Sequence, residues 1–199
     1  MLGTQKRRVW QSPWGYPEAI AIVGGLLLIG LVLQIAIGSF DFFLLANPVN
    51  FITGLVLFVL SIIIGFRAYN HALPRWICGV PMSVTLIFSM LVLTIIMGLT
   101  PQRVVGSDGD AMLLGFDSMT SNWSFVMLYG LTLLSLGATV FRRIRRLRLK
   151  DTPFILQHFG LWLLLAASGL GYADMERYIM FVSKGETQWR VYDADNEVK

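Results

Sequence analysis

Charged side chains are scarce in this sequence: Asp, Glu, Lys and Arg make up 14% of its 199 residues, whereas 55% of the residues are hydrophobic. Soluble globular domains carry about 25% charged residues. The mean hydropathy is +0.65, and several uncharged runs reach the roughly 20 residues that a helix needs to cross a bilayer. The shortage of charge excludes an ordinary soluble domain and predicts an integral membrane protein.

Cysteine is nearly absent from this sequence, and most sequence motifs of enzymes are missing. The single cysteine, Cys78, excludes an internal disulfide, a CxxC redox pair and a CxxCH haem-attachment site within this chain. There is no nucleotide-binding glycine loop, HExxH or GxSxG motif. The predicted membrane spans hold no acidic residue, which argues against a pump or secondary transporter with an ion path of its own.

Five uncharged runs predict transmembrane helices at about residues 19–40, 48–66, 77–99, 123–141 and 153–173. Residues 1–173 are therefore predicted to form an all-α, five-helix transmembrane domain. Prolines near the starts of three spans suit a first helical turn, where a missing amide hydrogen costs little. Ser121-Asn122 is a candidate cap for the fourth span.

Basic residues collect in alternate connections between the spans. They precede the first span (Lys6 to Arg8), follow the second (Arg67 and Arg75), and are densest before the fifth, from Arg142 to Lys150. By the positive-inside rule these segments are cytoplasmic, so the N-terminus is inside and the C-terminus outside. The net charge of +4 thus reflects membrane topology, and we expect a lipid bilayer and no nucleic acid as partner.

The composition changes after the last span, from residue 174 to residue 199. Residues 186–193 mix polar and apolar side chains with the strand-favouring Trp189, Val191 and Tyr192. This segment predicts the start of an extracytoplasmic, β-rich region. Because an isolated strand leaves its backbone unpaired, we expect either a partner or a continuation of the chain to complete the sheet.

His158 is the only histidine within a predicted span, and it lies close to the Arg142–Lys150 cluster. Ionisable groups at membrane depth cost free energy and usually have a function. Neutral imidazole is a common ligand of haem iron, and Phe154, Phe159 and Trp162 offer flat apolar surface for a porphyrin. The alternative is a packing histidine that bonds a carbonyl or hydroxyl group.

The other polar candidates are weaker. His71 falls in a basic connection and is either a solvated loop residue or a second metal ligand. Two histidine ligands from one chain would require that connection to fold into the membrane beside His158, so we expect a second ligand to come from another subunit. The pair Asp108 and Asp110 lacks the spacing of an EF-hand calcium loop and is interpreted as part of a flexible acidic loop.

A longer pattern starts at His158. His158-Phe159-Gly160-Leu161, a run of small and apolar residues, and then Gly171-Tyr172-Ala173-Asp174 resemble the ResB/CcsB family of cytochrome c biogenesis proteins (system II haem attachment). In that family a His-hydrophobic-Gly segment opens the last span before a large extracytoplasmic domain. Residues 115–125 (GFDSMTSNWSF), 176–178 and 184–187 are similar to the versions found in Bacteroidetes-type bacteria.

The resemblance implies a multi-pass protein of the bacterial inner (cytoplasmic) membrane that works beside a CcsA/ResC-type partner. Together they would deliver haem, bound transiently as a b-type cofactor, for covalent attachment to apocytochrome c on the outer side. The haem-ligating histidine of the family corresponds to His158. The family has fewer spans before its outer domain and one more after it. The chain thus corresponds to an N-terminal membrane portion, at most a subunit of a haem lyase complex.

Two other functions stay open. The chain is alternatively a haem-free scaffold that binds the partner and the apocytochrome. The remaining interpretation is a cytochrome b-type, quinol-linked membrane anchor, which normally holds haem between two histidines of its own. The two histidines of this sequence are poorly placed to supply that pair.

Overall fold

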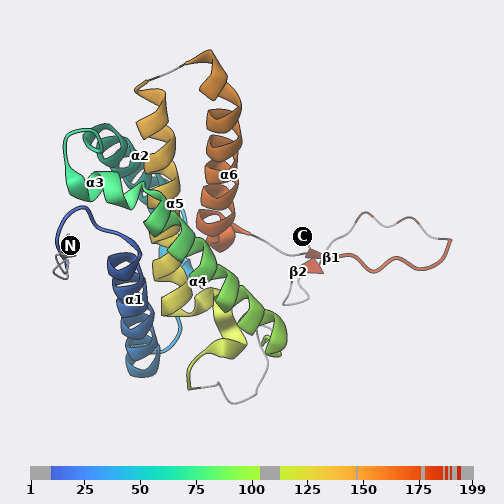
Figure 1. The fold of residues 1–199 in the computed structure, drawn as a ribbon. Helices are drawn as coiled ribbons and strands as arrows, with labels where there is room; N and C mark the ends of the chain where they lie inside the picture. Colours follow the sequence, from blue (N-terminus) through green and yellow to red (C-terminus); the bar gives the residue numbers. More distant parts are fainter. Residues whose placement is uncertain are drawn as a thin grey trace, which may run out of the picture.

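The computed structural model describes residues 10–103, 113–146, 148–175, 178–185, 187, 189 and 192–193. Figure 1 shows its long helices, which are α1 (Tyr16–Ile37), α2 (Val49–Arg67), α4 (Val80–Leu99), α5 (Trp123–Ile144) and α6 (Thr152–Leu170). Each is long and apolar enough to cross a membrane. The predicted helical class is confirmed, with five helices among the described residues that could span a membrane.

Shorter elements connect these helices. They are η1 (Phe42–Leu45), α3 (Ala72–Ile77), η2 (Phe116–Ser121), η3 (Leu149–Asp151) and η4 (Tyr172–Asp174), followed by the two-residue strands β1 (Tyr178–Ile179) and β2 (Tyr192–Asp193).

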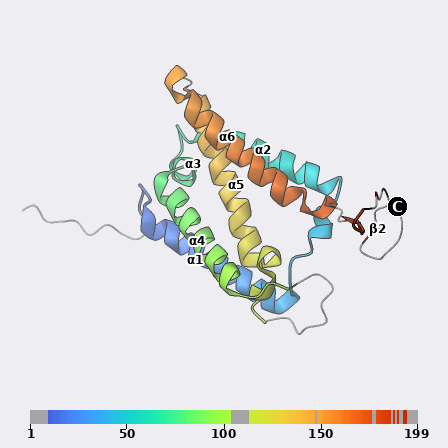
Figure 2. The same ribbon diagram turned by 90° about the vertical axis from the view of Figure 1, so that its right-hand side faces the viewer.

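Helix α5 is the centre of the bundle, because the four other long helices all pack against it. Helices α1 and α4 lie together on one side of α5, and α2 and α6 lie on the other (Figure 2). The buried share of α5 is 39%, against 11–22% for the other four. Its small residues Gly137 and Ala138 permit this close approach. The Ser124 and Ser135 hydroxyls donate to the carbonyls of Leu27 (3.0 Å) and Ile77 (2.7 Å).

The two ends of the bundle differ in charge. The basic end carries the α2–α3 connection, the C-terminal turn of α5 and the α5–α6 connection, with their arginines. Here Trp76 Nε1 donates to the Gly15 carbonyl over 3.2 Å and so ties α3 to the start of α1. The opposite end holds η1, η2 and η4. The chain thus runs alternately between the basic end and the opposite end (Figure 1).

Side chains and backbone close the opposite end. The Asn122 side chain accepts a hydrogen bond from the Ser124 amide over 2.9 Å, which confirms the predicted cap of α5. The Asp174 carboxylate accepts from the Asn47 amide (3.1 Å) and from the Asn50 side chain, both at the start of α2. Asp174 therefore fixes the point at which the chain leaves α6.

Two helices begin at positions other than those predicted. Helix α1 starts at Tyr16, about a turn earlier, because the Glu18 carboxylate accepts from the Gly15 amide (2.7 Å) and closes the first turn. The first membrane helix thus contains a buried acid, contrary to the prediction of none. The third long helix starts at Val80 after an extended Gly79, and residues 72–77 form the separate helix α3, with Pro74 inside it.

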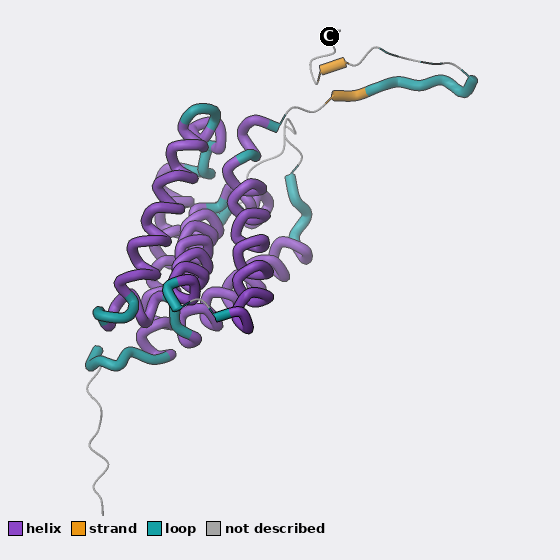
Figure 3. The backbone as a smooth tube through the Cα atoms, turned by 90° about the horizontal axis from the view of Figure 1, so that it is seen from above, coloured by secondary structure: helices purple, strands orange, loops and turns teal. Residues whose placement is uncertain are grey.

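The tail is described only in part. Tyr178 and Ile179 pair antiparallel with Asp193 and Tyr192, and this short ladder lies beyond the helices (Figure 3). Of the strand predicted over residues 186–193, the structure describes 187, 189, 192 and 193, and only the last two are in a strand. The remainder of that prediction, and the pair Asp108 and Asp110, lie outside the described residues.

The contact between α2 and α5 gives a direct test of the bundle. A Cβ atom added at Gly65 would lie 2.7 Å from the Ala138 carbonyl oxygen and 2.8 Å from Phe141 Cβ, so backbone would have to move. We expect Gly65→Ala to lower the free energy of unfolding by about 1–3 kcal/mol, measured by thermal unfolding in detergent. The control is Gly98→Ala in α4, where a Cβ meets nothing within 4 Å. Equal melting temperatures for the two variants would contradict the α2–α5 packing.

Candidate functional site

A polar cleft opens at the basic end, between α4 and α6 and over the last turns of α5. Its volume is about 730 Å³, within the roughly 300–1,000 Å³ of ligand-binding pockets. We call it the basic cleft. It is lined by Tyr69, Cys78, Gly79, Val80, Ser83, Val84, Thr139, Arg142, Arg143, Arg146, Arg148, Lys150, Asp151, Phe154 and His158.

The cleft follows from the arrangement around α5. Helix α6 packs against α5 and α2, whereas α4 packs against α5 and α1. At the basic end, the facing surfaces of α4 and α6 therefore do not pack against each other. Val80 and Val84 of α4 give the cleft an apolar wall, and the end of α5 brings arginines to its floor. The cleft consequently joins an apolar surface at membrane depth to a strongly basic surface.

His158 is held in one orientation by its own helix. Phe154 lies one turn before it on the same face of α6, and the two rings stack with centroids 3.8 Å apart. The His158 Nδ1 atom lies 2.9 Å from the Phe154 carbonyl oxygen. Donation to that carbonyl requires the proton on Nδ1, which leaves Nε2 with its lone pair. The half-buried imidazole thus offers one nitrogen for a ligand in the cleft.

The stack extends to the basic residues. The Arg143 guanidinium lies over the Phe154 ring, 4.4 Å from its centroid. Its Nη1 atom also lies 3.2 Å from Asp151 Oδ1, just before α6 begins. The last turn of α5 is therefore tied to the start of α6, and Arg143 is neutralised by Asp151, the one acidic side chain among the described residues that line the cleft.

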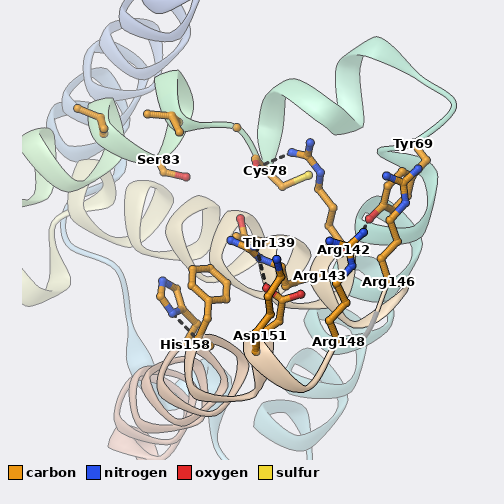
Figure 4. Close-up of a pocket in the computed structure, with 15 residues that line it drawn as sticks. Tyr69, Cys78, Ser83, Thr139, Arg142, Arg143, Arg146, Arg148, Asp151 and His158 are labelled. Carbon is orange, nitrogen blue, oxygen red and sulfur yellow. Dashed lines mark hydrogen bonds and ion pairs between the residues drawn. The ribbon is translucent and has the colours of Figure 1, made fainter.

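The other arginines divide into two groups. Arg142 Nη1 donates to the Cys78 carbonyl over 3.2 Å, and the Arg146 guanidinium lies 4.5 Å from the Tyr69 ring centroid. Both line the cleft. Arg145 lies over Tyr69 too and donates to the Phe66 carbonyl over 2.7 Å, but it does not line the cleft. In the view of Figure 4, Ser83 of α4 and His158 of α6 lie to the left, and Arg142, Arg146 and Arg148 lie to the right.

Cys78 lines the cleft as a buried thiol between α3 and α4. Its Sγ donates to the Pro74 carbonyl over 2.7 Å. Burial raises the pKa of Cys78, and the nearby Arg142 charge offsets only part of that increase. The thiol is accordingly a packed group of low reactivity, since a nucleophilic or metal-binding cysteine needs the thiolate.

Only part of the predicted site comes together. His158, Phe154 and most of the Arg142–Lys150 cluster share the cleft, whereas Phe159 and Trp162 pack with Leu133 toward α5 and α2. The proposed porphyrin surface is thus reduced to Phe154 among the aromatic residues of α6. His71 is exposed at the start of α3 and does not line the cleft.

Several cleft residues were missed in the sequence analysis. Tyr69, Ser83 and Thr139 belong to the lining, and Asp151 balances Arg143. A weak signal was present on α5, where polar residues recur at 135, 139, 142 and 146 with helical spacing. Within the described part of the chain, no three His, Cys, Asp or Glu side chains cluster as they do in a metal site made by protein ligands alone.

A second cavity, of about 300 Å³, lies at the opposite end between α2, α5 and α6. Phe42, Phe125, Tyr129 and Tyr172 contribute aromatic surface to it, and none of its described lining residues is charged. The Tyr129 hydroxyl is already used, because it donates to the Leu165 carbonyl over 2.6 Å. This cavity has apolar packing surface and no group placed for acid–base or metal chemistry.

No known protein-family model, curated protein or solved structure matches this chain.

The raised pKa of Cys78 gives a pH prediction. A thiol with a raised pKa holds less thiolate at a given pH, so its alkylation is slower at neutral pH and keeps accelerating with pH up to the raised value. We expect N-ethylmaleimide to label native Cys78 at pH 7 at least about tenfold more slowly than the exposed cysteine of a Cys78→Ser/Ser183→Cys variant. Labelling can be followed by mass spectrometry, with detergent-denatured protein as the reference. Equal rates for the two native proteins would show that Cys78 is not buried.

Proposed function

We propose that this chain is a membrane subunit of a cytochrome c haem-delivery and attachment complex, and that it binds haem in the basic cleft through His158. The observation that carries the proposal is the fixed imidazole: its Nδ1 faces the Phe154 carbonyl at 2.9 Å, and Nε2 is left for a ligand. A carbonyl partner on Nδ1 is the usual arrangement of metal-ligating histidines, because it sets the tautomer and the ring orientation. The ResB/CcsB resemblance supports the same residue.

The residues of the cleft fit a haem group in size and chemistry. Val80, Val84 and Phe154 offer apolar contacts, and the arginines favour an anionic ligand. Bound haem would supply the iron and the vinyl groups used in the attachment reaction. This chain would bind and orient it and exclude water from one face. The addition of the apocytochrome c thiols to the vinyl groups belongs outside, largely on a CcsA/ResC-type partner, which would also supply the second iron ligand.

The proposal includes an orientation in the bacterial inner membrane. The basic end is placed at the cytoplasmic face and the tail from residue 174 outside, because basic residues are retained on the inner side. The cleft then lies near the cytoplasmic surface, on the side from which newly made haem arrives. The β-rich outer segment would begin with the residues after Asp174.

One observation favours the haem-free scaffold as a second candidate. The bond between His158 Nδ1 and Phe154 is also what a packing histidine would make, and it would stabilise α6 without any ligand. A quinol-linked, b-type anchor has less support, since the described lining of the cleft contains one histidine, His158.

The haem proposal predicts a spectroscopic difference between the two histidines. Haemin titrated into the purified chain in detergent should show a shift of its Soret band on ligation, which His158→Ala and His158→Gln lose and His71→Ala keeps. The expected loss in affinity is about tenfold or more, because the only iron ligand from this chain is removed. Glutamine retains an amide that can bond the Phe154 carbonyl, so it separates ligation from packing. A Soret shift in His158→Gln equal to that of wild type would favour the scaffold.

The orientation has its own test. In a Cys78→Ser background, a cysteine at Ser183 should react with a membrane-impermeant maleimide in spheroplasts, and one at Ser12 should react only after the membrane is opened. The reason is that the basic end resists transfer across the membrane. The readout is a gel shift of the labelled chain. The reverse pattern would place the C-terminal tail in the cytoplasm and rule out the proposed orientation.

A further inference from the structure

The basic cleft holds an excess of positive charge that the described chain does not balance. Among the described residues that line it, five are basic and Asp151 alone carries a carboxylate; the basic residues are Arg142, Arg143, Arg146, Arg148 and Lys150. Asp151 is paired with Arg143 at 3.2 Å. Among the described residues, no carboxylate forms an ion pair with the other four. A cleft of this kind needs anionic groups from a ligand to be electrostatically balanced.

Two of the unbalanced arginines are held in place by uncharged partners. The Cys78 carbonyl accepts from Arg142 Nη1, and the Arg146 guanidinium lies over the Tyr69 ring, 4.5 Å from its centroid. Neither contact neutralises the charge, and each leaves other N–H groups of the planar fork free to bind. Guanidinium groups fixed in this way match the two oxygens of a carboxylate. These side chains thus lose their conformational entropy before a ligand binds, so the loss does not reduce the affinity for the ligand.

The position of the charge relative to His158 limits the kind of ligand. Arg142, Arg146 and Arg148 are set apart from His158 in the view of Figure 4, and the apolar Val80 and Val84 line the cleft along α4. A ligand that satisfies all three surfaces has a metal centre, a broad apolar body and at least one anionic edge. Haem has this chemistry, since its two carboxylates sit on the same edge of the ring.

We infer that Arg142, Arg146 and Arg148, with Lys150, bind the carboxylates of haem and so orient it with its carboxylate edge toward the basic end. The opposite, apolar edge, which carries the vinyl groups, then points along the cleft between α4 and α6. This inference rests on the proposed function and adds the side chains that determine orientation. Arg143 has a positioning role instead, because Asp151 and Phe154 already occupy it.

The inference is tested with a ligand that differs from haem only in its carboxylates. Haemin and haemin dimethyl ester are titrated into the full chain in nanodiscs of zwitterionic phosphatidylcholine, where no anionic lipid competes, and binding is read from the Soret band. The variants are Arg146→Gln/Arg148→Gln and the matched control Arg145→Gln, which removes an adjacent charge outside the cleft. Each variant is compared with wild type for the same ligand, so that partitioning of the ligand into lipid cancels from the ratio of the two affinities.

We expect the double variant to bind haemin about tenfold more weakly, the loss that one or two charge-assisted hydrogen bonds predict. Its affinity for the ester should equal that of wild type, and Arg145→Gln should leave both affinities unchanged. Arg148→Gln alone, for a side chain with no described ion pair, serves as a milder variant if the double variant is unstable, as judged by its melting temperature. Raising the salt concentration should weaken the binding of haemin more than that of the ester.

Three results would contradict these proposals, and they distinguish a failure of the carboxylate orientation from a failure of the proposed function. Equal weakening of haemin and ester by the double variant would overturn the orientation by carboxylates, because the effect would then be structural. The same holds if the double variant leaves the binding of haemin unchanged. If His158→Ala binds both ligands as tightly as wild type does, the proposed function itself fails, whatever the arginine variants show.

Discussion

The close approach of four helices to α5 is the constraint on which the rest of this structure depends. Between helices in a bilayer, lipid is as apolar as leucine, so burial of apolar surface contributes little to association. Small residues and hydroxyl groups take over that role here. Gly65 meets the backbone of α5 at Ala138, and Ser135 donates across to Ile77 at 2.7 Å. A bundle held in this way is stabilised along one central helix.

That arrangement also produces the cleft. Helices α1 and α4 use one side of α5, while α2 and α6 use the other, so α4 and α6 have only α5 in common. At the basic end the gap between them is not filled by side chains, and the last turn of α5 supplies Arg142 and Arg143 to its floor. The same helix that stabilises the fold thus positions the charge. The position of the cleft follows from packing, and its chemistry follows from the residues at the end of α5.

His158 illustrates how a costly residue is accommodated at membrane depth. Its Nδ1 is satisfied by the carbonyl of Phe154, one turn earlier, and its ring is covered by the Phe154 ring. The helix therefore needs no neighbour to orient the imidazole. Because the Nδ1 hydrogen bond is made within α6, the backbone of α6 alone determines the direction in which Nε2 points. Nε2 is thus the atom of this side chain at which a ligand in the cleft would bind.

The sequence by itself determined the number and approximate limits of the membrane helices, because an uncharged run of sufficient length has no stable alternative in a bilayer. It also placed the basic connections, the Asn122 cap and His158, all of which depend on local chemistry. Only the tertiary structure decided that Phe154 lines the cleft while Phe159 and Trp162 do not. It likewise decided that Arg145 lies outside the cleft and that α3 is separate from α4. The reason is physical: helices that are apolar all round show no periodic pattern for the face they bury.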